Sequence, residues 1–410
     1  MASRSDRPYD LVVFGATSFV GDILCRYLVR RHGTGGDLTW AIAGRSATKL
    51  EATANATGAD VPRIVTDATD PEAVAALVDS TRLVISTVGP YALYGSELVA
   101  AAAAAGTDYV DLTGEPQWMQ RMIDAHADAA AASGARIVHT CGFDSIPSDL
   151  GVWFTQQQAQ ARLGRHCTTI AMRVKAMKGG ASGGTVASLI NVVDETRADP
   201  ELRKALGNPY ALAPEGMRSG PRQPNVMKPT RDPASGEWIG PFVMAGINTK
   251  VVHRSHALLG RPWGDDFVYD EAMLMGEGPK GAAKASALVA GMGGFMGVAS
   301  VGRARGLLNR VLPAPGEGPS PEAQAAGFFD IRFFGTTADG QSITTKVTGD
   351  RDPGYGSTAK MLAESATTLL QINRGAKQGT PGGFWTPATA LGDRLIDALV
   401  DHAGLTFEVL

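Results

Sequence analysis

The sequence predicts an α/β fold, with a doubly wound parallel sheet in its first part and a second, mixed α+β domain after it. Strand-like apolar runs alternate with helical patterns up to about residue 145, which is typical of a parallel sheet covered by helices. The first run, Leu11–Phe14, ends at Gly15, and an amphipathic helical pattern follows at once. Polar residues or glycines stand where the later runs end, and ligands of such sheets bind beyond the carboxyl ends of the strands. We therefore expect a Rossmann-type, nucleotide-binding sheet.

The opening strand, turn and helix contain the candidate binding loop. Gly15 allows a tight turn, and Gly21 allows the helix to pack closely against the strand. The helix N-terminus offers unpaired N–H groups and a partial positive charge to a pyrophosphate. Ser18 replaces the middle glycine of the usual spacing, so that it adds a hydroxyl but narrows the space for the phosphate. The alternative is an ordinary strand–helix turn. The predicted cofactor-binding residues of this loop are Gly15, Ala16, Thr17, Ser18, Phe19, Val20 and Gly21.

The remaining elements of the first part follow in order. Further strands are predicted at Leu38–Ala43, Arg63–Val65, Leu83–Ser86, Tyr109–Leu112 and Arg136–His139. Helices are predicted to end near Thr57 and to span Pro71–Asp79, Ser96–Ala105 and Gln117–Ser133, with proline in the first turn of the second.

Residues at the ends of three of these strands indicate which cofactor is bound. An arginine after the second strand suits a 2′-phosphate, whereas an acidic residue there suits a free ribose hydroxyl. The residues found are Arg45 and Ser46, which favours NADP(H) over NAD; the alternative is a surface arginine in a solvated turn. Asp67 is expected either to bind the adenine amino group or to cap the loop before the next helix. A further set after the fourth strand is expected beside the nicotinamide ribose, with an ordinary turn as the alternative: Thr87, Val88, Gly89 and Pro90.

Composition excludes several classes of protein. Of the 410 residues 44% are hydrophobic and 19% charged, and the net charge is −3, so that neither disorder nor a nucleic-acid partner is expected. The three cysteines are widely spaced and form neither a disulfide framework nor a metal site. No apolar signal segment opens the chain. We expect a cytoplasmic protein without a metal.

The second part has a different pattern. The expected domains are residues 1–146 (cofactor binding), 147–355 (substrate binding and dimerisation) and 356–410 (C-terminal helices). Strands are predicted at Thr168–Met177, Phe328–Phe334 and Gln341–Val347, the last two joined by the turn signal Asp339-Gly340, and helices at Thr185–Leu206, Ser357–Asn373 and Thr386–His402. Residues 208–240 are rich in proline and glycine and are expected to form a long loop or a disordered segment.

The stretch Ala285–Gly302 carries no charge and has basic residues on both sides. One interpretation is a buried helix or the subunit interface of a homodimer, to which the pair Gly293 and Gly297 would be suited. A second is attachment to an anionic lipid surface at the inner face of the plasma membrane. A third is a membrane span, for which the length suffices but the glycine, alanine and serine content is unfavourable.

Several strings in the chain resemble those of a known family. They are Gly-Ala-Thr-Ser-Phe-Val-Gly, Ala-Gly-Arg-Ser, Val-Gly-Pro-Tyr, Tyr-Val-Asp-Leu-Thr-Gly-Glu, Cys-Gly-Phe-Asp-Ser-Ile-Pro-Ser-Asp-Leu-Gly, Asp-Pro-Gly-Tyr-Gly-Ser-Thr-Ala-Lys and Gly-Gly-Phe-Trp-Thr-Pro. They resemble the saccharopine dehydrogenase-like oxidoreductases, and among these most of all the trans-acting enoyl reductases that serve polyketide synthases. The resemblance implies NADP(H) binding, reduction of a carrier-bound enoyl thioester in lipid or polyketide biosynthesis, and an acyl-carrier domain as partner. It also implies that the C-terminal helices return toward the nucleotide domain.

Catalytic candidates lie after the fourth and sixth strands. Enoyl reduction requires a donor near the thioester oxygen and a proton for the α-carbon. Tyr91, Asp144 and Ser145 are the candidates, although none belongs to a recognisable catalytic set. Asp144 has the alternative role of capping the next helix. Two rival functions stay open: an amino-acid dehydrogenase of the saccharopine type, and a nucleotide-binding regulator or scaffold without turnover.

Overall fold

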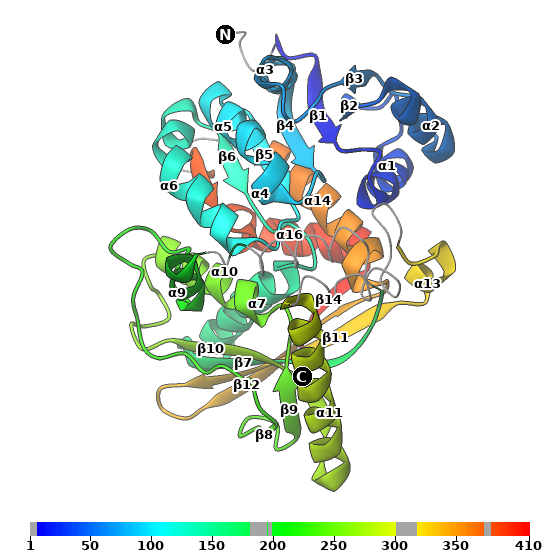
Figure 1. Cartoon of the computed structure of the whole chain (residues 1–410). Coiled ribbons are helices and arrows are strands. Elements are labelled where there is room, and N and C mark those ends of the chain that lie inside the picture. The colour runs from blue at the N-terminus through cyan, green and yellow to red at the C-terminus, as the bar shows by residue number, and fades with distance from the viewer. Residues whose placement is uncertain (1–5, 181–194, 196–198, 301–317, 373–378) are drawn as a thin grey trace. The chain divides into compact units, whose positions relative to one another are not determined.

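The computed structural model describes residues 6–180, 195, 199–300, 318–372 and 379–410 (Figure 1). The chain divides into two compact units. The first comprises Met1–Asp144 and Gly354–Ala403, and the second comprises Ser145–Pro353 and Gly404–Leu410. The sequence-based boundaries after residues 146 and 355 stay predictions about which segments fold as domains.

The first unit contains a parallel seven-stranded sheet, which confirms the predicted Rossmann-type fold. Its strands are β1 (Tyr9–Phe14), β2 (Trp40–Gly44), β3 (Arg63–Val65), β4 (Thr81–Ser86), β5 (Asp108–Asp111), β6 (Arg136–Val138) and β13 (Gly383–Trp385). Their order across the sheet is β13-β6-β5-β4-β1-β2-β3. The strand order changes direction between β1 and β4, because β2 and β3 lie on one side of β1 whereas β4, β5 and β6 lie on the other. Ligands of such sheets bind at this switch point. Residues Leu11–Phe14 are all buried, as expected for a strand covered on both faces.

Three of the helices of this unit begin at a capping side chain, which is Ser18, Ser46 or Asp70. Up to Gln371 the helices of the unit are α1 (Phe19–His32), α2 (Ala47–Thr57), α3 (Pro71–Asp79), α4 (Tyr91–Tyr94), α5 (Ser96–Ala105), α6 (Pro116–Ser133) and α14 (Thr358–Gln371), the last preceded by the short η3 (Pro353–Ser357). The Asp70 carboxylate accepts hydrogen bonds from the N–H groups of Glu72 and Ala73, and Pro71 follows it at the first helical position. The predicted bounds of α3 and α5 are confirmed.

The C-terminal part of this unit differs from the prediction in two ways. Strand β13 was not predicted, and it pairs in parallel with β6. The predicted continuous helix Thr386–His402 is wrong, because three short elements stand in its place: α15 (Pro387–Ala390), α16 (Gly392–Ala398) and η4 (Leu399–Ala403). The break falls at Leu391 (φ −120°) and at Gly392, whose φ of 49° lies in the left-handed region that suits glycine.

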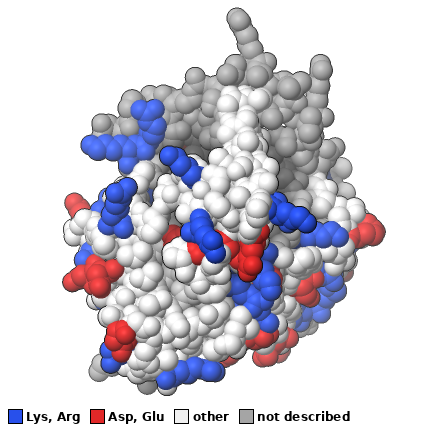
Figure 2. Space-filling view, turned by 90° about the horizontal axis from the view of Figure 1, so that it is seen from below, with Lys and Arg blue, Asp and Glu red and all other residues white. Residues whose placement is uncertain are grey.

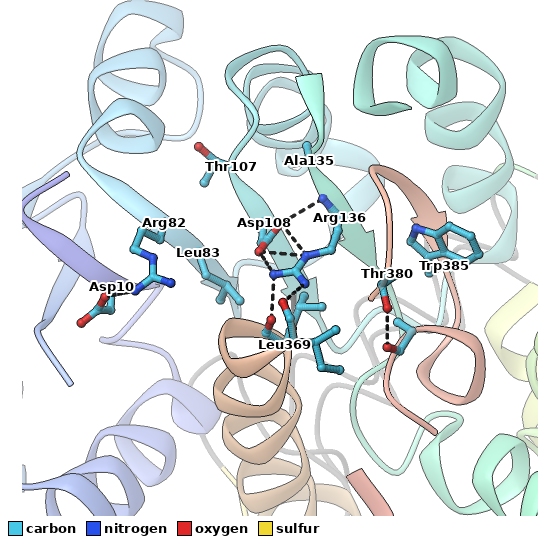
Figure 3. A network of polar contacts seen from close by, with 12 residues as sticks. Asp10, Arg82, Leu83, Thr107, Asp108, Ala135, Arg136, Leu369, Thr380 and Trp385 are labelled. Carbon is cyan, nitrogen blue, oxygen red and sulfur yellow. Dashed lines mark hydrogen bonds and ion pairs between the residues drawn. The ribbon is translucent and has the colours of Figure 1, made fainter. Parts of the chain in front are cut away.

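A buried arginine fixes helix α14 to the sheet (Figure 3). Arg136, at the start of β6, pairs with Asp108 at the start of the neighbouring β5, and both side chains are almost inaccessible to solvent. The same guanidinium donates to the carbonyl oxygens of Leu369 and Ile372, each at 2.7 Å. These carbonyls lie at the C-terminal end of α14, where the backbone carbonyls have no N–H donor within the helix. One side chain thus neutralises Asp108 and caps a helix.

The second unit contains a mixed seven-stranded sheet with the order β14-β12-β11-β7-β10-β9-β8. Its elements are α7 (Ile146–Leu163), β7 (Cys167–Lys178), α9 (Pro200–Gly207), β8 (Thr230–Arg231), β9 (Trp238–Pro241), α10 (Ala245–Leu258), β10 (Val268–Gly276), α11 (Gly278–Ser300), α13 (Pro321–Ala325), β11 (Phe328–Thr337), β12 (Ser342–Gly349) and β14 (Leu405–Val409). Strands β7 and β10 are parallel, and the other pairs are antiparallel. The second, mixed domain of the prediction is therefore confirmed as a fold class.

Part of the segment 208–240, predicted as one long loop, forms strands β8 and β9. Asp232, which follows β8, accepts two hydrogen bonds from the buried guanidinium of Arg173, which also pairs with Asp270 at 2.8 Å. This buried ion-pair network holds the β8–β9 hairpin on the sheet. Of the predicted helix Thr185–Leu206, residues 185–194 and 196–198 lie outside the described residues, and α9 covers its end.

On the face shown in Figure 2, basic and acidic side chains are mixed, and uncharged surface separates the charged groups from one another in many places. Pairing of this kind also occurs along the second sheet. The Lys346 Nζ lies 2.6 Å from a carboxylate oxygen of Glu408, and Arg332 lies 2.8 Å from Asp330. These pairs are only partly exposed; ion pairs at the surface contribute little to stability, about 0–1 kcal/mol each.

The uncharged stretch that begins at Ala285 lies in α11, and the part of it after residue 300 lies outside the described residues. No helix within the described part of the chain has the length and apolar character needed to cross a membrane. Ala285 is buried, whereas Gly293 and Gly297 are exposed and a side chain added at either would meet no atom within 4 Å. Among the described residues, no helix therefore packs on this glycine pair.

Candidate functional site

The loop after β1 is built around two glycines. Gly15 has a φ of 90°, and a Cβ atom there would lie 2.7 Å from the Thr87 hydroxyl oxygen. A Cβ atom on Gly21 would lie 2.3 Å from the carbonyl oxygen of Gly15, closer than any side chain can approach. The roles predicted for these glycines, a tight turn and close packing of helix on strand, agree with this geometry.

A chain of hydroxyl groups links this loop to the end of β4. Thr87 Oγ1 donates to the Gly15 carbonyl at 2.9 Å, so its remaining lone pairs accept from Ser18 Oγ, also at 2.9 Å. Ser18 Oγ in turn accepts from the N–H of Gly21 at 3.0 Å and caps α1. Ser18 therefore uses its hydroxyl to hold the loop in shape, which the sequence did not indicate.

Three N–H groups at the start of α1 donate to no acceptor among the described residues. Those of Gly15 and Ala16 are occupied by the carbonyl of Ala43. Those of Thr17, Phe19 and Val20 have no such partner within the part of the chain that the structure describes. Free N–H groups at a helix N-terminus suit a phosphate group. The geometry therefore fits the pyrophosphate of a dinucleotide.

Arg45 and Asp67 follow β2 and β3, which pair in parallel. Arg45 is exposed, and within the described residues its guanidinium forms no hydrogen bond or ion pair. Ser46 caps α2 by accepting from the N–H of Lys49. Asp67 accepts from the N–H and the hydroxyl of Thr69, and these bonds, with a smaller effect from the charge of Arg45, lower the pKa of Asp67. The loop-capping role of Asp67 is thus present, and its contact with adenine stays a prediction.

The turn Thr87–Pro90 leads into α4, whose start is fixed by a residue that the sequence-based prediction did not include. The Glu115 carboxylate accepts from the N–H groups of Tyr91 and Ala92, each at 2.9 Å. The Tyr91 ring is buried and its hydroxyl donates to the Ser86 carbonyl at 3.0 Å. Burial, with the charge of Asp111 next, raises the pKa of Tyr91 well above its ordinary value. Tyr91 would have to leave this bond to donate a proton, and its catalytic role stays a prediction.

Asp111 and His139, at the ends of β5 and β6, form a buried pair. His139 Nδ1 lies 2.7 Å from Asp111 Oδ2. The other carboxylate oxygen accepts from the N–H groups of Thr113 and Thr140. Thr140 has a φ of 62°, which is uncommon for a residue with a branched side chain. Such conformations persist where the surroundings hold them in place, and they are concentrated at functional sites.

Asp144 follows His139 in the loop after β6 and belongs to the same unit. Its carboxylate is half-buried, and one of its oxygens would lie 3.5 Å from a Cβ atom placed on Gly114. Burial raises the pKa of Asp144 to about 7; a hydrogen bond from its own backbone N–H opposes the rise, and the charge of Asp111 adds to it. A carboxyl group with this pKa is partly protonated at neutral pH and is able to donate a proton there.

Ser145, the third catalytic candidate, belongs to the second unit. Its hydroxyl is buried and donates to Asn248 Oδ1 at 3.0 Å. The Asn248 amide donates in turn to Ser148 Oγ and to the Glu271 carboxylate. Burial raises the pKa of Glu271 to about 7. Ser145 is thus a member of a buried polar network in its own unit, and a catalytic role for it stays a prediction.

The structure brings most of the predicted cofactor residues to one edge of the parallel sheet. The glycine loop, Arg45, Asp67 and the turn 87–90 follow β1, β2, β3 and β4. Asp111 and Glu115 were not singled out from the sequence, although both lie in the string Tyr109–Glu115 at the end of β5. In the described part of the chain, no group of three or more His, Cys, Asp or Glu side chains is placed to hold a metal ion.

Comparisons with known proteins place these features among oxidoreductases. Residues 11–138 match the family described as the saccharopine dehydrogenase NADP-binding domain. A relative from Mycobacterium tuberculosis, provisionally named a trans-acting enoyl reductase, is 39% identical over 97% of this chain and 96% of its own length. Proteins of M. tuberculosis and Mycobacterium leprae named trans-acting enoyl reductase are each 36% identical over 97% of this chain and 97% of their own length.

One solved structure shares the fold over nearly the whole length. The apo form of saccharopine dehydrogenase (L-Glu forming) from Saccharomyces cerevisiae has a TM-score of 0.54 and covers 98% of this chain and 100% of its own. At 14% identity this likeness shows the fold alone.

Proposed function

The chain belongs to the trans-acting enoyl reductase family, and from this premise we propose that it reduces a carrier-bound enoyl thioester with NADPH. Its first unit is an NADP-binding domain of the saccharopine dehydrogenase type. The observation that carries the proposal is the position of Asp144, a carboxyl group that follows β6 in the same unit as the dinucleotide-binding loop, and burial raises its pKa to about 7. A reductase of this kind needs both a dinucleotide site and an acid, and one unit contains both.

The residues of the first unit fit the cofactor. The N–H groups of Thr17, Phe19 and Val20 would hold the pyrophosphate, and the exposed guanidinium of Arg45 would pair with the 2′-phosphate. The turn Thr87–Pro90 would lie along the nicotinamide ribose. When bound, NADPH supplies the hydride that the β-carbon of the enoyl thioester receives.

Replacement of Arg45 by glutamate is expected to reverse the cofactor preference. The wild type should bind NADPH more tightly than NADH by at least about tenfold, since an arginine–phosphate pair contributes about 1.5–3 kcal/mol. In Arg45→Glu the carboxylate would repel the 2′-phosphate and accept from a free ribose hydroxyl. Calorimetric titration of both cofactors measures this, with Arg82→Glu as a control because Arg82 pairs with Asp10 at the opposite ends of the strands. Equal affinities of the wild type for the two cofactors would contradict the assignment of Arg45 to the 2′-phosphate.

Asp144 is the residue that we assign as proton donor to the α-carbon. Hydride addition at the β-carbon leaves the electron pair on the α-carbon and thioester oxygen, and the carboxyl proton of Asp144 then completes the reduced acyl group. Asp144 regains its proton from solvent, which its half-buried position allows. Because the acid form is required, the rate should fall as the pH rises through about 7.

Asp144→Asn is expected to lower kcat at least about tenfold, or ~1.4 kcal/mol, and to abolish this fall in rate above neutral pH. Tyr91→Phe is the matched comparison, because it removes a hydroxyl that is already bonded to the Ser86 carbonyl, and its loss should be smaller. NADPH oxidation followed with an enoyl thioester on an acyl-carrier domain measures both. A larger loss in Tyr91→Phe would transfer the role of donor to Tyr91.

The two rival functions have less support. An amino-acid dehydrogenase of the saccharopine type requires cations for several substrate carboxylates. The cation Arg173 of the second unit is buried and bound to Asp232 and Asp270 instead. A regulator without turnover would not need a carboxylic acid that is poised near neutral pH.

A carrier-borne substrate implies an acyl-carrier domain of a polyketide synthase as partner.

A lipid product implies that the reaction takes place near a membrane. We include in the proposal that α11 contacts an anionic lipid surface, with a homodimer interface as the competing role. Leu288, Val289, Met292 and Phe295 are partly exposed along the helix, with exposed Lys284 before them. Basic residues beside an apolar helix favour anionic lipid.

Phe295→Asp is expected to reduce flotation with vesicles of anionic phospholipid at low salt several-fold, because it places a charge among the apolar side chains. Ala290→Asp, at an exposed position of the same helix, is the control for charge alone and should reduce flotation less. If the wild type does not float at low salt, lipid contact is wrong, and sedimentation of the two variants then tests the dimer interface.

A further inference from the structure

The string Asp352–Lys360 is one of those that resemble the known family, and neither the cofactor site nor the proposed acid accounts for it. Its residues Pro353–Ser357 form the π-helical turn η3, and Thr358 is the first residue of α14. Turns with π-helical hydrogen bonds are rare and are frequently found at functional sites. From Gly354 onward the string belongs to the first unit, which also contains the glycine loop.

Tyr355 supports the start of α1. Its buried ring contacts the ring of Phe19 edge-on, with the ring centroids 5.2 Å apart and the ring planes at 80°. Phe19 is the first residue of α1, and its N–H is one of the free groups that fit a pyrophosphate. Farther along, Glu364 of α14 accepts a hydrogen bond from the Tyr27 hydroxyl of α1 at 2.7 Å, so the two helices are joined at a second point (Figure 1). The ring of Tyr355 therefore restricts the position of the Phe19 N–H group.

Thr358 holds the loop that contains Asp144. Its Oγ1 atom accepts a buried hydrogen bond from the N–H of Phe143 at 2.9 Å. A Cβ atom placed on Gly142 would lie 2.8 Å from Thr358 Cγ2 and 2.9 Å from Asp144 Oδ2. The Thr358 side chain and the Asp144 carboxylate therefore share the space beside Gly142, and only a residue without a side chain fits there.

We propose that Tyr355 and Thr358 are positioning residues, which hold the dinucleotide-binding loop and the Asp144 loop from one site at the start of α14. Tyr355 acts through Phe19 on the N–H groups that would bind the pyrophosphate. Thr358 acts through the Phe143 N–H on the position of the Asp144 carboxylate. The catalytic importance of Thr358 rests on the proposed function, whereas the role of Tyr355 in dinucleotide binding does not.

Tyr355→Leu is expected to weaken NADPH binding about fivefold, because leucine fills part of the space but lacks the edge-on ring contact with Phe19. Calorimetric titration of the full-length protein measures this. Tyr355→Phe keeps the ring and should bind NADPH within about twofold of the wild type. The matched control is Phe154→Leu, which breaks an edge-on ring pair with Phe407 in the second unit and should leave the affinity unchanged. An unchanged affinity in Tyr355→Leu, or an equal loss in Phe154→Leu, overturns the role of Tyr355.

A ligand without a pyrophosphate separates positioning from a general loss of structure. Adenosine 2′-monophosphate carries the adenine and the 2′-phosphate of NADPH but not the groups that the start of α1 would bind. Tyr355→Leu should therefore bind adenosine 2′-monophosphate as tightly as the wild type does, although it binds NADPH more weakly. A loss by the same factor for both ligands would show that the substitution disturbs the whole nucleotide domain, and would reject the positioning role.

Thr358→Val keeps the shape of the side chain but removes the acceptor of the Phe143 N–H. Exchange of this N–H with solvent hydrogen, followed by NMR without cofactor, should become at least about tenfold faster. Thr358→Ser retains the hydroxyl and should exchange as slowly as the wild type. With the enoyl substrate, kcat should fall about tenfold in Thr358→Val but not in Thr358→Ser, because a displaced acid reacts more slowly. The affinity for NADPH should stay within about twofold of the wild type in both variants.

The two readouts for Thr358 separate the inference from the proposed function. Wild-type exchange of the Phe143 N–H in Thr358→Val, or faster exchange with an unchanged kcat, overturns the role of Thr358. Faster exchange in Thr358→Val, together with a wild type that reduces no enoyl substrate, would leave the support of the loop intact and reject the proposed function instead.

Discussion

Gly21→Ala is expected to weaken NADPH binding about 100-fold, or on the order of 2.7 kcal/mol. The added methyl group would lie 2.3 Å from the Gly15 carbonyl oxygen and 2.8 Å from two backbone atoms of Ala16. Because these are backbone atoms, the start of α1 has to move away from β1, and the N–H groups that would hold the pyrophosphate move with it. Overpacking of this kind costs about 1–3 kcal/mol in well-packed sites.

The sign of the effect makes this prediction specific. Alanine in place of glycine within a helix normally stabilises it by about 1 kcal/mol. Gly291→Ala is the matched control, since Gly291 is a helical glycine in α11 with no atom near its missing side chain. It should leave the NADPH affinity unchanged and raise stability slightly. A Kd for NADPH in Gly21→Ala within about threefold of the wild type would contradict the predicted binding loop.

Arg136→Met is expected to lower the free energy of unfolding by about 3–5 kcal/mol. The substitution leaves the carboxylate of Asp108 buried without its partner and removes the donors to the Leu369 and Ile372 carbonyls (Figure 3). Helix α14 then loses its cap as well as its attachment to β6. Urea denaturation, followed by circular dichroism, measures the loss.

Two comparison variants separate the buried charge from other effects. The double variant Arg136→Met with Asp108→Leu should recover part of the loss, because no unpaired charge remains. Arg82→Met breaks the neighbouring pair with Asp10, whose side chains are 39% and 20% exposed, and should cost only about 0–1 kcal/mol. A loss in Arg136→Met no larger than in Arg82→Met would show that the network contributes little.

The first unit was predictable because its signals are local. Helix α3 has an aspartate cap followed by proline, and β1 has an uninterrupted apolar run, so that short segments determine their own structure. Strand β13 was missed because it has only three residues and forms by pairing with β6, almost 250 positions earlier in the chain. Likewise β8 and β9 depend on the buried ion pair of Arg173 with Asp232, which no local pattern reveals.

The candidate site, like the first unit, was predictable where its signals are local in the sequence. The glycine loop and the role of Arg45 were predicted directly from the strand–turn–helix pattern. Asp111 and Glu115 act as buried hydrogen-bond acceptors, and their partners are known only once the strands are in register. The sequence also could not show that the hydroxyl of Ser18, at the position usual for glycine, is bonded to Thr87 and to the backbone of Gly21.

The measurement that tests the central proposal most directly is NADPH oxidation by the wild type with an enoyl thioester carried on an acyl-carrier domain. Saccharopine-like amino acids with NADP and the carrier without an acyl group are tested beside it. The proposal predicts oxidation of NADPH with only the enoyl substrate, and an acyl product two mass units heavier. Turnover of the amino acids alone would contradict it and establish the amino-acid dehydrogenase, and NADPH binding without turnover of either class would indicate a regulator.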